Sequence, residues 1–176
     1  FYREFEEFVT PVLDDEFAYL WDNEEEYNHH KECNYATHLR QEMSLGWHHL
    51  INNEIISGTK EELMDYVYKG LVDLVLHEVG HTLGLRHNFK ASSIYSIDQL
   101  SDRNFTEKYG ISGSVMDYHP VCLLDKGHTL FQTTPGPYDL WAIEYGYKQF
   151  TDNNEESNLS QIAEKSNHPL LTYGTD

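Results

Sequence analysis

The chain has 176 residues, enough for one domain whose folding removes roughly two thirds of the unfolded chain's surface from water. Twelve lysines and arginines stand against 30 aspartates and glutamates, and the resulting formal charge of −18 repels phosphate backbones and anionic headgroups. The longest unbroken apolar run, residues 17–21, is far shorter than the roughly 20 residues of a membrane span. We therefore expect no nucleic-acid partner and no membrane span.

The chain start and the two cysteines bear on its origin. The sequence opens Phe1-Tyr2 without an initiator methionine, so we expect it to be part of a longer or processed chain. Cys33 and Cys122 lack Cys-x-x-Cys spacing, and they either pair in an oxidising compartment or stay as two buried thiols. We expect an extracytoplasmic protein, secreted or periplasmic.

The first third of the chain predicts helices rather than a sheet. Residues 1–58 show no convincing alternation of apolar and polar residues, and the acidic run at residues 22–26 is typical of a solvated turn. An amphipathic helix is predicted within residues 34–52 by four apolar residues at helical spacing: Leu39, Met43, Trp47 and Leu50.

A long helix is predicted to begin at Thr59. Thr59 and Glu62 form a capping box, and no proline follows before Gly84. A wide apolar face predicts burial on much of its circumference, through Leu63, Val67, Leu71, Leu74, Val75 and Leu76. Asp73 interrupts this face; we favour a solvent-facing position over a role as hydrogen-bond acceptor for a metal ligand's ring.

The rest of the chain predicts shorter elements. Residues 92–113 are expected to form a connection with one short helix near residues 105–109, and a turn at residues 135–137 precedes a helix over residues 138–147. From residue 151 the composition is polar, which predicts a loosely packed tail over residues 151–176.

The sequence His77-Glu78-Val79-Gly80-His81 lies within the predicted long helix. Four-residue spacing puts both imidazoles on one face, and Gly84 allows the chain to turn back so that His87 reaches the same ion. Three neutral imidazoles leave one position of a tetrahedral Zn²⁺ for water, and Glu78 is placed to accept that water's proton. The alternative is a helix that merely carries two histidines and a glutamate; Gly84 and His87 favour zinc.

With Gly84 and His87, the pattern resembles the extended signature of the metzincins, His-Glu-x-x-His-x-x-Gly-x-x-His followed by a Met-turn. Ser114-Val115-Met116-Asp117-Tyr118 resembles that Met-turn, which implies that Met116 underlies the imidazoles. The resemblance to astacin-like and serralysin-like members implies that Tyr118 stabilises an oxyanion; a packed or surface tyrosine is the alternative.

The similarity runs from about Glu62 to Tyr147 and includes residues 136–147, which resemble the helix that closes the metzincin lower subdomain. The whole set is most similar to large, poorly characterised bacterial zinc-dependent metalloproteases. Asn88 departs from the residue that follows the third histidine in astacins, serralysins, matrixins and adamalysins. The resemblance implies a mainly α chain, the α-rich lower part of a metzincin (zincin-like α+β) catalytic domain with little sheet. Residues 1–150 would form this domain, with a helical part over 1–58 and a zinc-binding core over 59–150.

The resemblance implies a zinc-dependent metalloendopeptidase that acts on proteins or peptides. Metzincins bind an extended peptide along an edge strand, and residues 1–58 offer no such strand. The alternative is therefore a catalytically silent zinc-bound module for peptide binding or scaffolding. Five further histidines lack ligand spacing and are expected to be ordinary: His29, His30, His38, His48 and His49. His119 and His128 follow the Met-turn and are expected to line the cleft without binding the metal.

Overall fold

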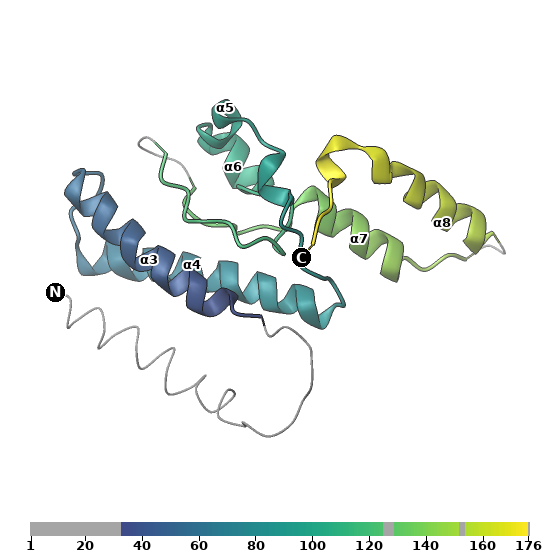
Figure 1. Cartoon of the computed structure of the whole chain (residues 1–176), viewed down its shortest axis with the longest axis horizontal. Coiled ribbons are helices and arrows are strands. Elements are labelled where there is room, and N and C mark those ends of the chain that lie inside the picture. Colours follow the sequence, from purple (N-terminus) through teal and green to yellow (C-terminus); the bar gives the residue numbers. More distant parts are fainter. Residues whose placement is uncertain (1–32, 125–128, 152–153, 176) are drawn as a thin grey trace, which may run out of the picture. The chain divides into compact units, whose positions relative to one another are not determined.

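The computed structural model describes residues 33–124, 129–151 and 154–175 (Figure 1). The chain forms two compact units, residues 1–33 and 34–176, and only Cys33 of the first is described. The predicted acidic turn at residues 22–26, His29, His30 and His128 lie outside the described residues. The described part is mainly α and contains no strand, as predicted. Among its helices we find none whose length and apolarity would carry it across a bilayer.

Helix α3, Tyr35–Asn52, confirms the predicted amphipathic helix. Its buried side includes the four predicted apolar residues, and this side packs against α4, Lys60–Thr82. Glycine permits the close approach of the two helices, because a Cβ on Gly46 would overlap the Tyr66 hydroxyl and one on Gly70 would overlap the Met43 sulfur. The two helices form the frame on which the candidate site is built (Figure 1).

Helix α4 begins as predicted. The Thr59 hydroxyl accepts the Glu62 amide proton at 3.2 Å, and the Glu62 carboxylate accepts the Thr59 amide proton at 2.9 Å. After the helix ends at Thr82, Gly84 adopts a φ of +84°, a left-handed conformation that glycine takes without strain. The chain therefore reverses just after the second histidine of the motif.

The prediction that α4 is buried on much of its circumference is wrong for the described structure. Only a narrow stripe is buried, and it consists largely of small or polar residues: Tyr66, Val67, Gly70, Asp73, His77 and Gly80. Val75 and Val79 are about half exposed. The neighbours of α4 in the described part, which are α3 and the loops after residue 110, lie along that stripe.

The described residues between 85 and 136, which exclude 125–128, form short helices joined by loops. The helices are η2 at Ala91–Ser93, α5 at Ile97–Leu100 and α6 at Arg103–Tyr109; the last agrees with the predicted short helix. Buried Gln132 links two loop segments: its Oε1 accepts the backbone amide protons of Ile111 and Ser112, and its Nε2 donates to the carbonyls of Ser112 and Thr134. One side chain thus supplies hydrogen bonds of the kind a sheet would provide.

Helix α7, Pro137–Tyr147, confirms the last predicted helix, with its proline in the first turn. The following residues differ from the loosely packed tail we expected. They form α8 at Glu155–Ala163, η3 at Glu164–Asn167 and η4 at Pro169–Leu171, and α8 packs on α7. Ile162 is buried, and its carbonyl accepts the Trp141 indole proton at 2.8 Å. The buried Ile162 side chain and the Trp141 indole hydrogen bond attach α8 to α7, although the composition of this segment is otherwise polar.

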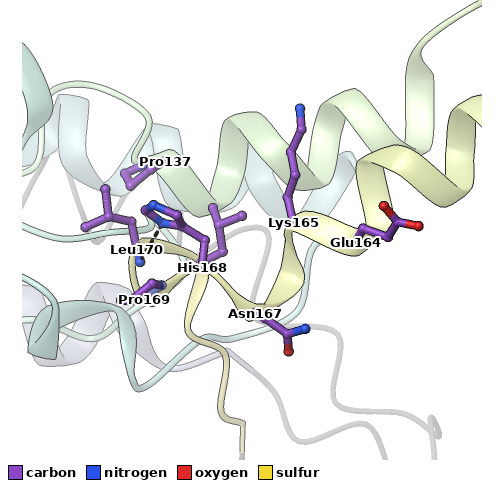
Figure 2. Close-up of a pocket in the computed structure, with 8 residues that line it drawn as sticks. Pro137, Glu164, Lys165, Asn167, His168, Pro169 and Leu170 are labelled. Atoms are coloured by element: carbon purple, nitrogen blue, oxygen red, sulfur yellow. Dashed lines mark hydrogen bonds between the residues drawn. The ribbon is translucent and has the colours of Figure 1, made fainter.

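A hollow lies where η3 and η4 meet the start of α7 (Figure 2). Pro137, His168 and Leu170 are among its lining residues, and the Leu170 amide donates to His168 Nδ1. None of the residues of the zinc motif lines it.

Candidate metal centre

Helix α4 and the turn after it bring three imidazoles together. His77 and His81 lie one turn apart with ring centroids at 4.8 Å, and the reversal at Gly84 returns His87 to them. The Nε2 atoms of His81 and His87 are 3.1 Å apart. Two nitrogens bound to one tetrahedral Zn²⁺ lie about 3.3 Å apart, since each Zn–N bond is about 2.0–2.1 Å. The spacing therefore fits a shared ion.

Backbone carbonyls orient two of these rings. His77 Nδ1 lies 2.7 Å from the Val115 carbonyl oxygen, and His81 Nδ1 lies 3.1 Å from that of Leu85. A carbonyl can only accept, so Nδ1 carries the proton in both rings and Nε2 keeps the lone pair that binds a metal. Burial lowers the pKa of His77 to about 3, so this ring is neutral at ordinary pH.

A fourth donor, absent from the sequence-based ligand set, lies with the imidazoles. The candidate ligand atoms of Cys33, His77, His81 and His87 all lie within 4.8 Å of one another. Cys33 is bonded directly to Asn34, where the second unit begins. Cys33 and Cys122, both described, are not joined in a disulfide. The sequence does not indicate Cys33 as a ligand, because it lacks Cys-x-x-Cys spacing and its neighbours at the site are distant in sequence.

Glu78 and Met116 differ in burial. Glu78 follows His77 on the exposed surface of α4, whereas Met116 is fully buried. A Cβ on Gly80 would overlap the Met116 sulfur, so the glycine within the motif makes room for this methionine against the helix. The sulfur thus packs against the turn of α4 that carries the ligands.

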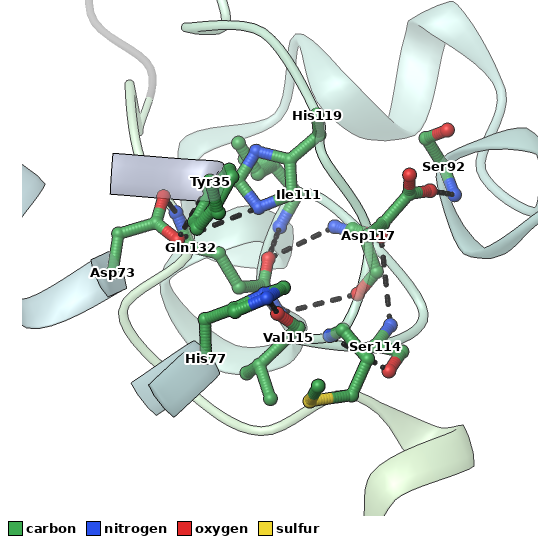
Figure 3. Close-up of polar contacts among 12 residues, drawn as sticks. Tyr35, Asp73, His77, Ser92, Ile111, Ser114, Val115, Asp117, His119 and Gln132 are labelled. Atoms are coloured by element: carbon green, nitrogen blue, oxygen red, sulfur yellow. Dashed lines mark hydrogen bonds and ion pairs between the residues drawn. The ribbon is translucent and has the colours of Figure 1, made fainter. Parts of the chain in front are cut away.

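The Met-turn is attached to α7 by Asp139. The carboxylate accepts the Ser114 hydroxyl proton and the amide protons of Val115 and Gly136, at 2.9 and 2.8 Å for the amides. Its burial raises the carboxyl pKa, against the lowering effect of these hydrogen bonds. The Val115 carbonyl oxygen lies against His77 Nδ1 (Figure 3), so the hydrogen bond from Val115 to Asp139 connects α7 with the segment that orients this candidate ligand. A supporting role for residues 136–147 stays a prediction.

Tyr118 lies against the imidazoles. Its half-buried ring has centroid distances of 5.5 Å to His77 and 4.8 Å to His87. The Asn34 amide donates to its hydroxyl oxygen at 3.1 Å, and the His38 ring stacks at 6.0 Å. The sequence predicts an ordinary histidine at position 38, because nothing in the spacing of His38 connects it with Tyr118.

Asn88 follows His87, where four metzincin groups carry other residues, and it connects three segments of the chain. It is fully buried, and its backbone amide donates to the Met116 carbonyl at 2.9 Å. Its Nδ2 donates to the Thr172 carbonyl and its Oδ1 accepts the Gly174 amide proton, each at 3.0 Å. The loop that carries His87 is therefore attached to both the Met-turn and the C-terminal segment.

The favoured prediction of a solvent-facing Asp73 is wrong, because Asp73 is fully buried. The Nδ1 atoms of His77 and His81 lie against backbone carbonyls rather than against Asp73. Its carboxylate accepts the Tyr35 hydroxyl proton and the Gln132 amide proton, each at 3.0 Å. His119 is also buried, with Nε2 at 3.6 Å from Asp73 Oδ1, so it lines no open cleft. Desolvation raises the pKa of the Asp73 carboxyl.

A family model described as Met-zincin matches residues 59–176, about two thirds of the sequence. The chain therefore belongs to the Met-zincin family, which agrees with the metzincin signature and the helical fold. No curated protein and no solved structure matches the chain.

The environment of His77 predicts a pH dependence of folding in metal-free protein. Unfolded His77 takes a proton near its ordinary pKa of 6.5, whereas the folded ring resists protonation down to about 3. The free energy of unfolding should therefore fall as the pH drops through this window, by up to about 1.4 kcal/mol per pH unit. The free energy of unfolding of His77→Asn, whose amide can still donate to Val115, should fall less than that of the native protein between pH 7 and pH 4, as measured by denaturant titration. Parallel curves would contradict the buried neutral ring.

The contact of Gly80 with Met116 predicts that Gly80→Ala lowers stability. The new methyl group must displace a fully buried sulfur, which costs about 1–3 kcal/mol. Gly146→Ala is the matched control, because this helical glycine of α7 has open space around it and alanine favours helices by about 1 kcal/mol. Thermal denaturation should show a lower Tm for the first variant and an equal or higher Tm for the second. A gain for both would refute the close contact.

Proposed function

We propose that this protein is a zinc-dependent metalloendopeptidase. The observation that carries the proposal is the convergence of three imidazoles, two of them oriented by backbone carbonyls, close to the exposed Glu78 in the sequence of α4. Membership of the Met-zincin family supports zinc as the ion. His77, His81 and His87 would hold it, each through Nε2.

The donor chemistry fits Zn²⁺. Imidazole nitrogens are ligands that zinc prefers, and zinc-binding histidines usually donate the other ring N–H to a carbonyl or carboxylate that fixes the ring's orientation. When bound, the ion supplies a Lewis acid and lowers the pKa of a water molecule to about 7.

The residues of the chain would divide the remaining work. Glu78 would accept a proton from the attacking water and return it to the leaving amine. The Tyr118 hydroxyl would donate a hydrogen bond to the oxygen that gains negative charge on the peptide carbonyl. Met116 would support the imidazoles from below. The substrate would be a protein or peptide, and an extracytoplasmic location stays a prediction.

Glu78→Gln tests the assigned chemistry. The amide cannot take up a proton, so cleavage of a mixed peptide library should fall by at least about 100-fold while zinc content is unchanged. Glu61→Gln, at another exposed position of α4, should leave cleavage unchanged. Products would be measured by mass spectrometry and zinc by elemental analysis. Equal cleavage by native protein and Glu78→Gln would remove Glu78 from the mechanism.

Cys33 favours a second candidate function, a catalytically silent zinc module. Structural zinc sites take all four ligands from the protein, and a thiolate with three imidazoles would complete such a set. A closed site of this kind would leave no position for water and would serve peptide binding or scaffolding instead.

Substitution of Cys33 separates the two candidates. The silent module predicts that Cys33→Ser weakens zinc binding and abolishes sulfur-to-metal charge-transfer absorption in the Co²⁺-loaded protein, without any gain of turnover. The metallopeptidase predicts that Cys33→Ser retains zinc and cleaves the peptide library. Cys122→Ser is the control cysteine and should match native protein in zinc affinity, absorption spectrum and cleavage.

A further inference from the structure

We propose that Tyr35 and Asp73 are positioning residues of the zinc site. Neither belongs to the metzincin signature, and neither carries a ligand atom of the candidate cluster. The inference concerns how that cluster is held, and it rests on the proposed function only in taking His77 as a zinc ligand.

Tyr35 contacts both a ligand and the candidate oxyanion residue. Its ring is fully buried, with its centroid 4.4 Å from that of His77 and 5.0 Å from that of Tyr118. The Val115 carbonyl fixes one edge of the His77 ring, and the Tyr35 ring packs against the same His77 ring. A shift of Tyr35 would therefore let His77 rotate about its hydrogen bond and let Tyr118 move with it.

Asp73 fixes Tyr35 in place. The Tyr35 hydroxyl donates to Asp73 Oδ1 across the contact of α3 with α4, while Asp73 Oδ2 accepts the Gln132 amide proton (Figure 3). An aromatic ring held only by packing can shift, whereas a ring whose hydroxyl is hydrogen-bonded to a buried carboxylate has a defined position. His77 follows Asp73 by four residues on the same helical stripe, so the anchor and the ligand move as one unit.

Asn34 adds a second link between the start of α3 and Tyr118. Its amide donates to the Tyr118 hydroxyl oxygen, next to the residue whose ring stacks on the Tyr118 ring. Asn34 and Tyr35, at the start of α3, thus both contact Tyr118. The Tyr35–Asp73 hydrogen bond connects this end of α3 to α4, the helix that carries His77 and His81.

Tyr35→Phe tests the inference, with Tyr66→Phe as the matched control. Both tyrosines are buried, and each donates one hydrogen bond between α3 and α4; Tyr66 bonds the Met43 carbonyl at 2.9 Å. Both variants should lower the Tm. Only Tyr35→Phe should weaken zinc binding, by about 10-fold in competition with a chromophoric chelator, and change the visible absorption of Co²⁺-loaded protein.

Asp73→Asn shows whether Asp73 acts through Tyr35. The asparagine amide has one oxygen for the two donors, Tyr35 and Gln132, so Asp73→Asn should also weaken zinc binding. The double variant with Tyr35→Phe should bind zinc no more weakly than the weaker-binding single variant. Additive losses would assign the two residues independent roles and overturn the coupling. If Asp73→Asn does not fold, the comparison of Tyr35→Phe with Tyr66→Phe decides alone.

A metal-free measurement separates this inference from the proposed function. In native metal-free protein the His77 ring protons experience the Tyr35 ring current, and Tyr35→Phe should shift these NMR signals while Tyr66→Phe leaves them in place. That result supports the positioning role even if no peptide is cleaved. Equal effects of both variants on zinc affinity and on the His77 signals would overturn it.

Discussion

The structure depends on hydrogen bonds from imidazole Nδ1 atoms to backbone carbonyls. His77 and His81 each donate to a carbonyl, which leaves both Nε2 atoms facing the same region as His87. Helix α4 alone would place two rings on one face without fixing their rotation. Since the acceptors lie in the Met-turn and in the turn after α4, the candidate metal centre is formed jointly by the helix and the loops that pack against it.

Buried polar side chains hold those loops where the described residues form no sheet. Asp139 attaches the Met-turn to α7, Gln132 joins two loop segments, and Asn88 connects the loop that carries His87 with the C-terminal segment. Buried polar groups of this kind are costly unless every partner is present, and here most of their atoms have partners. The loops are therefore held in place by specific hydrogen bonds, and this rigidity is what a metal site with ligands on both helix and loop requires.

Local patterns predicted much of this structure. Helical spacing identified α3, the Thr59 capping box identified the start of α4, and the signature placed three imidazoles together. The failures concern partners that are distant along the chain. Asp73 was expected at the surface, because nothing near it in sequence reveals Tyr35 or Gln132. Cys33 lies in the cluster although its sequence neighbours do not indicate it, because the three histidines are distant along the chain. The C-terminal segment packs through buried Ile162 and through hydrogen bonds to Trp141 and Asn88, which its polar composition does not indicate.

Zinc X-ray absorption spectroscopy of protein loaded with one equivalent of Zn²⁺ tests the central claim most directly. The account predicts three imidazole nitrogens at about 2.0–2.1 Å from each ion, and one fewer in the His87→Ala protein. A fourth ligand of either oxygen or sulfur is compatible with that result and identifies which of the two candidate functions applies. A native spectrum with fewer than three imidazoles, or one that His87→Ala leaves unchanged, would contradict the account.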